Sequence, residues 1–123
     1  MENNSTLKDI NEEFNQFIGT DTYYKHWLGF VYTDGVKAVA DKYGAYWLLD
    51  LIFSYQYLNK IKTEKFQIWI ITANNKKAIV EMRIDTDQPI LIKQEILFTD
   101  FPNNGILKLY FTDNKVLLLP SEY

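Results

Sequence analysis

Cysteine is absent from the 123 residues, and histidine occurs only once, as His26. A chain without cysteine has no thiolate nucleophile, no zinc finger, no iron–sulfur ligation and no disulfide, which fits a reducing compartment. A single imidazole is also too few for the usual multi-histidine zinc site. We therefore expect a protein that uses no catalytic thiol, no metal and no cofactor.

Long apolar runs are lacking as well. The densest one, 45–53, is interrupted by Asp50 and falls short of the roughly 20 residues that a membrane-spanning helix needs. The first residues are polar and acidic, unlike the basic and then apolar start of a secretory signal. The expectation is a cytoplasmic protein without membrane contact. Its composition, 47% apolar and 24% charged, is that of one globular domain over 1–123.

A strong excess of one charge is also missing, since 13 basic and 16 acidic residues give a net charge of −3. The charge is nevertheless uneven along the chain. Residues 1–58 carry eight acids and four bases, 59–83 carry two acids and six bases, and 84–123 carry six acids and three bases. Proteins that hold a nucleic-acid backbone usually show a clear basic excess, and a DNA mimic needs far denser carboxylates. Neither class fits the whole chain.

The first apolar stripe with the period of a helix lies in 7–18. Ser5 or Thr6 would cap this helix, and Gly19 would end it as a left-handed residue. A second helix is expected over 34–42 with Asp34 as its cap. A third is expected over 45–59, where the apolar stripe consists of Trp47, Leu48, Leu51, Ile52 and Tyr55.

After Lys60 the apolar period changes from about 3.6 to 2, which is typical of strands. The turns between these strands are too short for the crossover that parallel strands require, so the sheet should be an antiparallel meander. The predicted fold class is α+β, with three N-terminal helices packed on a C-terminal antiparallel sheet of about five strands. The strands are expected at 66–73, 78–84, 90–98, 106–112 and 115–119.

Candidate catalytic groups are isolated in the sequence. A serine–histidine–acid triad would need His26, yet no Gly-x-Ser-x-Gly elbow is present. Asp85 and Asp87 resemble part of a calcium loop, but a proline follows at once, which favours a charged hairpin turn. Asp50 lies in the third helix, where pairing with a lysine or a tyrosine hydroxyl is favoured over acid–base work. We predict no catalytic residue, with an unrecognised enzyme as an alternative.

Lysines gather in the basic stretch 60–77. The expected strand 66–73 separates them, and eight residues at about 3.3 Å each place the two groups roughly 26 Å apart. Each group is then a small cluster at one end of a strand. The first cluster is the candidate contact for nucleic acid and consists of Lys60, Lys62 and Lys65.

Aromatic residues are the one unusual feature, at 16% of the chain. They crowd the connector 20–32, which is expected to be an ordered loop. Tyrosine and tryptophan offer large contact area at low entropic cost and dominate interface hot spots. The alternative is that they cover the core beneath the loop. The candidate partner-binding residues are Tyr23, Tyr24, His26, Trp27, Tyr32 and Asp34.

Four motifs occur in order along most of the chain: Tyr-Thr-Asp-Gly-Val-Lys at 32–37, Gly-Ala-Tyr-Trp-Leu-Leu-Asp at 44–50, Thr-Asp-Phe-Pro at 99–102 and Leu-Leu-Leu-Pro-Ser-Glu-Tyr at 117–123. With these motifs the chain resembles a family of small bacterial and phage proteins of unknown function. The resemblance carries no catalytic residues. It implies a setting among phages and mobile elements, whose short proteins often disarm host defence.

The function expected from this resemblance is a non-enzymatic protein-binding module, namely an anti-CRISPR inhibitor of an RNA-guided nuclease, including the RNA-targeting type VI class. Its partner would be the effector nuclease or the complex with its guide RNA. The alternatives are a nucleic-acid-binding accessory protein that uses 60–77, or an enzyme. The oligomeric state is left open by the sequence.

Overall fold

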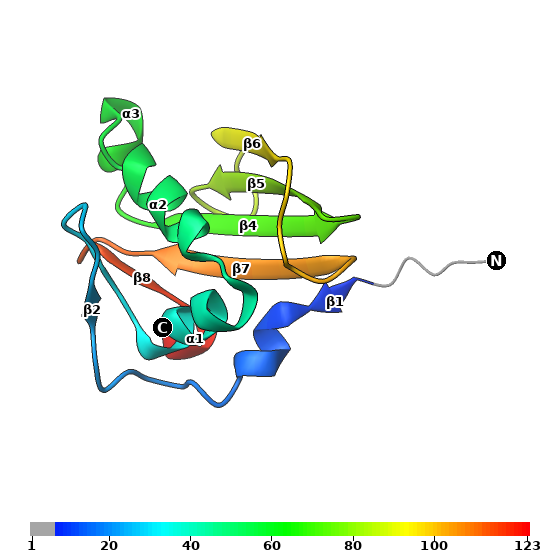
Figure 1. Cartoon of the computed structure of the whole chain (residues 1–123). Coiled ribbons are helices and arrows are strands. Elements are labelled where there is room, and N and C mark those ends of the chain that lie inside the picture. The colour runs from blue at the N-terminus through cyan, green and yellow to red at the C-terminus, as the bar shows by residue number, and fades with distance from the viewer. Residues whose placement is uncertain (1–6) are drawn as a thin grey trace.

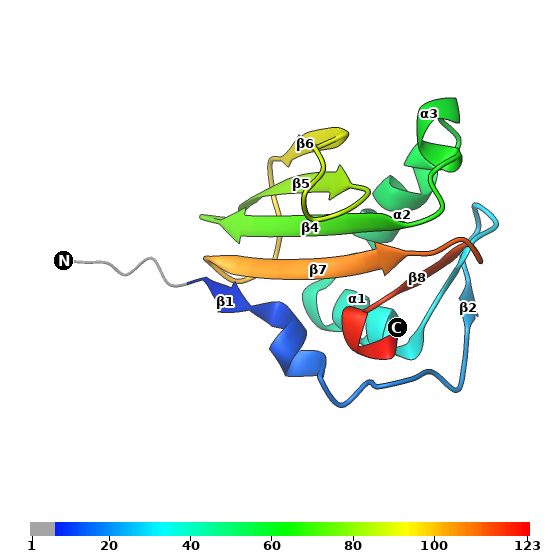
Figure 2. The ribbon, with the colours of Figure 1, turned by 180° about the vertical axis from the view of Figure 1, so that it is seen from behind.

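The computed structural model describes residues 7–123 and shows an eight-stranded sheet with helices on one face. Helices α1 (Asp34–Tyr43) and α2 (Tyr46–Tyr55) lie on the same side of the sheet (Figure 1), and the view from behind shows its other face uncovered (Figure 2). The short helix α3 (Asn59–Lys62) lies at the end where strand β4 begins. Within these residues, no helix has both the length and the apolarity to cross a bilayer.

Four long strands form the middle and one edge of the sheet, in the order β7-β4-β5-β6. All neighbours among them are antiparallel, and their bounds are Gly105–Phe111 for β7, Gln67–Asn74 for β4, Lys77–Arg83 for β5 and Ile92–Ile96 for β6. On the far side of β7 the sheet continues through three short strands: β8 (Val116–Leu118), β3 (Val31–Tyr32) and β2 (Tyr24–Lys25). Strand β1 (Lys8–Asp9) also pairs with β7.

The fold class α+β is confirmed, but the five-stranded meander is too simple. Strands β4, β5 and β6 do follow one another as a meander. The chain then crosses back along residues 97–104, so that β7 pairs with the opposite edge of β4 (Figure 1). The sheet also contains two parallel pairs, β1–β7 and β3–β8, which a meander cannot contain. Moreover, three short strands precede the helices, which are therefore not simply N-terminal.

The predicted helix over 7–18 is wrong, and its expected caps, Ser5 or Thr6, lie outside the described residues. The segment forms β1 and the 3-10 helix η1 (Ile10–Phe14) instead. Long-range hydrogen bonds to β7 override the helical period, because the Asn11 side chain bonds to the backbone of β7 as a neighbouring strand would. Its Oδ1 accepts from the N–H of Lys108 at 2.8 Å, and its Nδ2 donates to the carbonyl of Lys108 at 2.9 Å. Gly19 does not have a positive φ, so it is not the left-handed helix end that the sequence predicts.

The second and third helices are confirmed with small changes. Thr33, not Asp34, caps α1, because its Oγ1 accepts from the N–H of Val36. Gly44, with φ of 59°, ends α1 in the left-handed region. Helix α2 is apolar on nearly every side, and its fully buried residues are Leu48, Leu49, Ile52 and Phe53.

The core lies between the helices and the sheet. Alternate residues of β4 and β7 point into it, among them Trp69, Ile71, Leu107 and Leu109. One polar cluster is enclosed with them: the amides of Gln56 and Gln67 pair reciprocally at 2.8 Å, and Trp69 donates its indole N–H to Gln67 Oε1. Because buried amides are costly without partners, this cluster fixes how α2 lies against β4.

Candidate functional site

The turn at 26–30 presents one exposed tryptophan on a fixed backbone. The N–H of His26 donates to the carbonyl of Phe30 at 2.8 Å, and the N–H of Gly29 donates to the carbonyl of His26 at 2.9 Å. Gly29 has φ of 101°, which a residue with a Cβ rarely adopts. The tight turn leaves the side chain of Trp27 78% exposed.

His26 is the buried anchor of this turn, with only 6% of its surface exposed. Its Nδ1 accepts from the N–H of Leu28 at 3.1 Å, and its Nε2 lies 2.6 Å from Oδ1 of Asp50. A nitrogen that accepts from an amide carries no proton, so the proton of the neutral ring is on Nε2, and Nε2–H donates to the carboxylate. The edge contact of His26 with Phe53, 4.7 Å between ring centroids, seats the ring against α2.

Asp50 also fixes Trp27. The indole Nε1–H of Trp27 donates to the same Oδ1 at 3.2 Å, and the rings of Trp27 and His26 lie 5.6 Å apart. Among residues 7–123, none donates to the other carboxylate oxygen, Oδ2. The result is an exposed indole ring with a carboxylate oxygen beside it, both held in place by contacts within the fold.

The outer side of α2 continues this surface. Trp27, the outer side of α2 and Gln94 of the edge strand β6 line a shallow hollow of about 530 Å³. We call the exposed and half-buried side chains around this hollow the Trp27 surface, which consists of Trp27, Trp47, Asp50, Leu51, Ser54 and Tyr55. Along α2, Asp50 and Ser54 are exposed, and beside them Trp47 and Leu51 are half-buried against the core, so part of their apolar surface remains open to solvent.

The structure divides the predicted partner-binding set. Trp27 lies on the Trp27 surface, and His26 supports it from within. Tyr24 and Tyr32 stack on each other between β2 and β3, with ring centroids 5.6 Å apart. Asp34 accepts from the backbone N–H of Asp21 at 3.0 Å, so it fastens the connector to α1.

Tyr23 belongs to a different part of the molecule. It is exposed at a hollow of about 550 Å³ that Lys65, Phe66 and Tyr123 also line. Phe66 and Tyr123 pack with Tyr110 in a small group of rings on that side. Tyr23 is therefore not part of the Trp27 surface.

Sequence reasoning misses the contribution of α2. The helical period assigns Trp47, Leu51 and Tyr55 to the buried stripe, whereas they are half-buried and line the hollow beside Trp27. The signal that could have found them is the number of apolar residues in α2, which exceeds what one face can bury. Asp50 is expected from the sequence to pair with a lysine or tyrosine, and its partners are His26 and Trp27.

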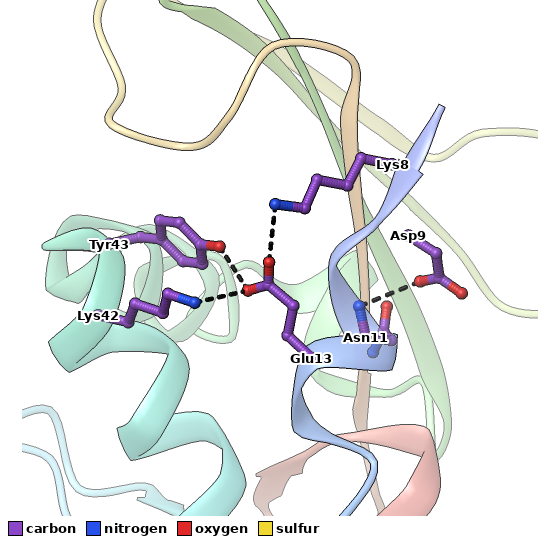
Figure 3. Close-up of polar contacts among 6 residues, drawn as sticks. All are labelled: Lys8, Asp9, Asn11, Glu13, Lys42 and Tyr43. Atoms are coloured by element: carbon purple, nitrogen blue, oxygen red, sulfur yellow. Dashed lines mark hydrogen bonds and ion pairs between the residues drawn. The ribbon is translucent and has the colours of Figure 1, made fainter. Parts of the chain in front are cut away.

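A second polar cluster joins η1 to α1 (Figure 3). Glu13 accepts from Lys8 at 2.9 Å, from the hydroxyl of Tyr43 at 2.5 Å and from Lys42 at 3.2 Å. The hydrogen bonds from Lys8 and then Tyr43 lower the pKa of Glu13 to about 2. Burial, followed by the hydrogen bond to Glu13, raises the pKa of Tyr43 to about 12. These contacts tie η1 to α1, and we assign the four groups a structural role.

The candidate nucleic-acid contacts are exposed. Lys60 and Lys62 flank Ile61, whose burial anchors α3, and Lys65 follows just before β4. At the other end of β4, Lys76 lies in the turn and Lys77 is the first residue of β5. The basic stretch is thus two separate clusters.

The hydrogen bonds of His26 limit the chemistry that its ring can perform. Both ring nitrogens of His26 are engaged, so the imidazole has no free lone pair with which to take a proton from a substrate. The Ser54 hydroxyl donates to the carbonyl of Leu51 at 2.8 Å and forms no hydrogen bond with His26 or Asp50. In the part of the chain that the structure describes, no three acidic or histidine side chains are grouped so that they could hold a metal ion.

Comparison with known proteins identifies a family for this chain. The model of a family described as "Family of unknown function (DUF6876)" matches residues 8–123. No curated protein and no solved structure matched the sequence. The resemblance to a whole-chain family of unknown function is thereby confirmed, and the chain belongs to the DUF6876 family.

Proposed function

We propose that this protein works by binding another protein through the Trp27 surface, without catalysis. The observation that carries the proposal is the indole of Trp27, exposed yet fixed by its hydrogen bond to Asp50 and by the turn around His26. An exposed side chain that is already ordered loses little entropy when a partner covers it. Exposed tryptophans of this kind are typical hot spots of protein interfaces.

The chemistry of the Trp27 surface points to a basic partner. An arginine can lie over the indole face as a cation–π contact and donate to the free Oδ2 of Asp50. Trp47 and Leu51 supply the apolar area around that contact. Proteins that hold RNA carry exposed arginine and lysine for the phosphates. We therefore propose as the partner an RNA-guided nuclease, including the RNA-targeting type VI class, with the chain acting as an anti-CRISPR inhibitor.

The test uses purified type VI nucleases with their guide RNA. Binding is measured by calorimetry, and inhibition is measured as the loss of target-RNA cleavage when the protein is added. Trp27→Ala and Asp50→Ala should each weaken binding at least ten-fold, the former because a hot-spot tryptophan contributes about 2 kcal/mol or more. Tyr123→Ala is the matched control, since Tyr123 is 75% exposed on a different surface.

The outcomes test two claims separately: that the Trp27 surface is the interface, and that the partner is an RNA-guided nuclease. A nuclease that is bound and inhibited equally by the wild type and by Trp27→Ala would refute the Trp27 surface as the interface. If no RNA-guided nuclease is bound or inhibited, the anti-CRISPR assignment fails, whereas the general assignment as a binding protein is then tested on other basic partners.

The nucleic-acid-binding alternative is favoured by one observation, the exposed cluster of Lys60, Lys62 and Lys65 next to Phe66. If this cluster held RNA or DNA, affinity would fall steeply with salt and would be lost when the three lysines are changed to glutamate. Changing Lys76 and Lys77 in the same way is the control, because these residues lie at the other end of β4. Binding that is absent, or equal in both variants, removes this alternative.

A further inference from the structure

Strand β6 is a free edge of the sheet. It pairs with β5 on one side, and within residues 7–123 no strand lies against its other side. Figure 1 shows β6 at the margin of the sheet, with the crossing segment 97–104 leaving on the helix side. An exposed edge offers unpaired N–H and C=O groups and invites a further strand.

Apolar side chains flank this edge on both ends. Leu97 is 80% exposed, and Ile90, Leu91 and Phe98 are exposed as well. Natural edges are commonly protected by short length, proline or charge, in particular lysine. The only basic residue in β6, Lys93, has Glu95 two positions away on the same, uncovered face of the sheet. The charge on this edge is therefore balanced and does not repel a strand with the matching pattern.

The sequence of β6 is complementary to itself when it is reversed. If two copies pair in antiparallel fashion about Gln94, then Lys93 lies opposite Glu95 and Ile92 lies opposite Ile96. Just outside β6, where the chain bends, the same register would bring Leu91 near Leu97 and Ile90 near Phe98 of the other copy. Opposite charges and apolar pairs that face each other across two strands are the contacts that stabilise a sheet.

The same pattern disfavours other registers. If the register between the two copies shifts, the side chains stay on the same face of the sheet only when the shift is an even number of residues. A slip by two in one direction places Lys93 opposite the Lys93 of the other copy, and a slip in the other direction places Glu95 opposite its counterpart. Like charges directly opposite each other destabilise a pair of strands. Only the register about Gln94 pairs every charge with its opposite.

We propose that the chain forms a symmetric dimer in which β6 of one copy pairs with β6 of a second copy, so that the two sheets become one continuous sheet. The two-fold axis passes through the Gln94 pair, as an interface formed by the same patch on both subunits requires. Tyr55 donates its hydroxyl to Gln94 Oε1 at 2.7 Å, so the Trp27 surface of each copy lies next to the axis. The dimer does not depend on the proposed binding of a nuclease.

Charge exchange tests the register. The wild type should sediment at twice the 14.6 kDa chain mass, with a concentration-dependent return to monomer. Lys93→Glu and Glu95→Lys should each raise the dissociation constant about ten-fold or more, because both copies then present like charges. A mixture of the two variants should form a heterodimer, and the double variant Lys93→Glu/Glu95→Lys should form a homodimer again. Thermal melts of each variant check that the fold is kept.

A cysteine provides a second and independent readout, because the chain has none of its own. Residues directly opposite in antiparallel strands have Cα atoms about 4.5–5.5 Å apart, within the range of a disulfide. Gln94→Cys should therefore form a disulfide-linked dimer under mild oxidation, whereas Asn114→Cys, in an exposed turn, should not. A wild type that is monomeric at all concentrations, charge variants that dimerise as the wild type does, or Gln94→Cys that cross-links no better than the control would overturn the proposal.

Discussion

The carboxylate of Glu122 accepts a hydrogen bond from the N–H of Gly35 at 3.0 Å, which joins the end of the chain to the start of α1. The same carboxylate accepts from the hydroxyl of Thr33 at 2.6 Å and from the N–H of Leu119 at 2.9 Å. An acid at a helix N-terminus also interacts favourably with the helix dipole. Two of the motifs that carry the family resemblance, 32–37 and 117–123, thus form one structural unit.

Gly35 is required there because of space. A Cβ at this position would lie 2.6 Å from Leu119 Cδ1 and 2.7 Å from Glu122 Oε1. Gly35→Ala should therefore lower the free energy of unfolding by about 1–3 kcal/mol, as overpacking usually does. Gly19→Ala is the control, because a Cβ on Gly19 would meet no atom within 4 Å and its φ is not positive. Urea unfolding of both variants measures the difference, and equal stability would show that Leu119 and Glu122 move aside freely.

Glu13 should make stability depend on pH in the acid range. Its pKa is lowered from 4.5 to about 2 in the fold, so the unfolded chain binds the proton more readily. The stabilisation is thus fully present above about pH 4.5 and is lost as the pH falls towards 2. Because Lys8 and Lys42 are half exposed, we expect a loss of only about 1–2 kcal/mol.

The variant Glu13→Gln should lack this part of the pH dependence, and the exposed neighbour Glu12 provides the control Glu12→Gln. Urea unfolding between about pH 2.5 and 6 measures the slope. If Glu13→Gln and the wild type lose stability in parallel over this range, the cluster in Figure 3 does not contribute as argued.

The buried amide pair should show strong coupling. Gln67→Leu leaves the Oε1 of Gln56 and the indole N–H of Trp69 without a partner, at a cost of about 2–4 kcal/mol. Gln56→Leu should cost less, because Gln67 keeps two partners, the carbonyl of Ile61 and the indole N–H of Trp69. The double variant should cost less than the sum of the two single changes, because the unpaired amides are then removed together. Denaturant unfolding of the four proteins gives the coupling energy, and strict additivity would contradict the network.

Trp27 and His26 should respond differently to truncation. Trp27→Ala removes an exposed ring and should change the free energy of unfolding by less than about 1 kcal/mol. His26→Ala opens a cavity against Phe53 and leaves the N–H of Leu28 without its acceptor, at about 2–3 kcal/mol. Thermal melts of the two variants test this contrast. A large loss on truncating Trp27 would mean that its role is to stabilise the fold.

Much of the fold can be predicted from local patterns. Helices α1 and α2 and the strands β4, β5, β6, β7 and β8 lie where the apolar period and the turn residues indicate them. The segment 7–18 resembles a helix in sequence because its apolar spacing fits one. What decides its structure is the distant backbone of Lys108 and Asn104, which bond to Asn11 and Lys8 and leave no trace in the local sequence.

The candidate site can be predicted in part. The aromatic density of the connector draws attention to Trp27, but proximity in sequence does not distinguish the exposed Trp27 from Tyr24, which is half-buried in a strand pair. The contact of Asp50 with His26 joins residues 24 positions apart, so no local spacing reveals it. Only the tertiary structure shows that α2 packs against the connector.

The crossing segment between β6 and β7 also bears on the order in which the molecule folds. The pairs β4–β5 and β5–β6 close over short turns and can form early, because short loops cost little entropy. Strand β7 must return past both to reach β4, and β1 then joins β7 through Lys8 and Gly105, almost a hundred residues apart in the chain. Contacts of such long sequence separation slow folding, so the N-terminal strands should complete the sheet last.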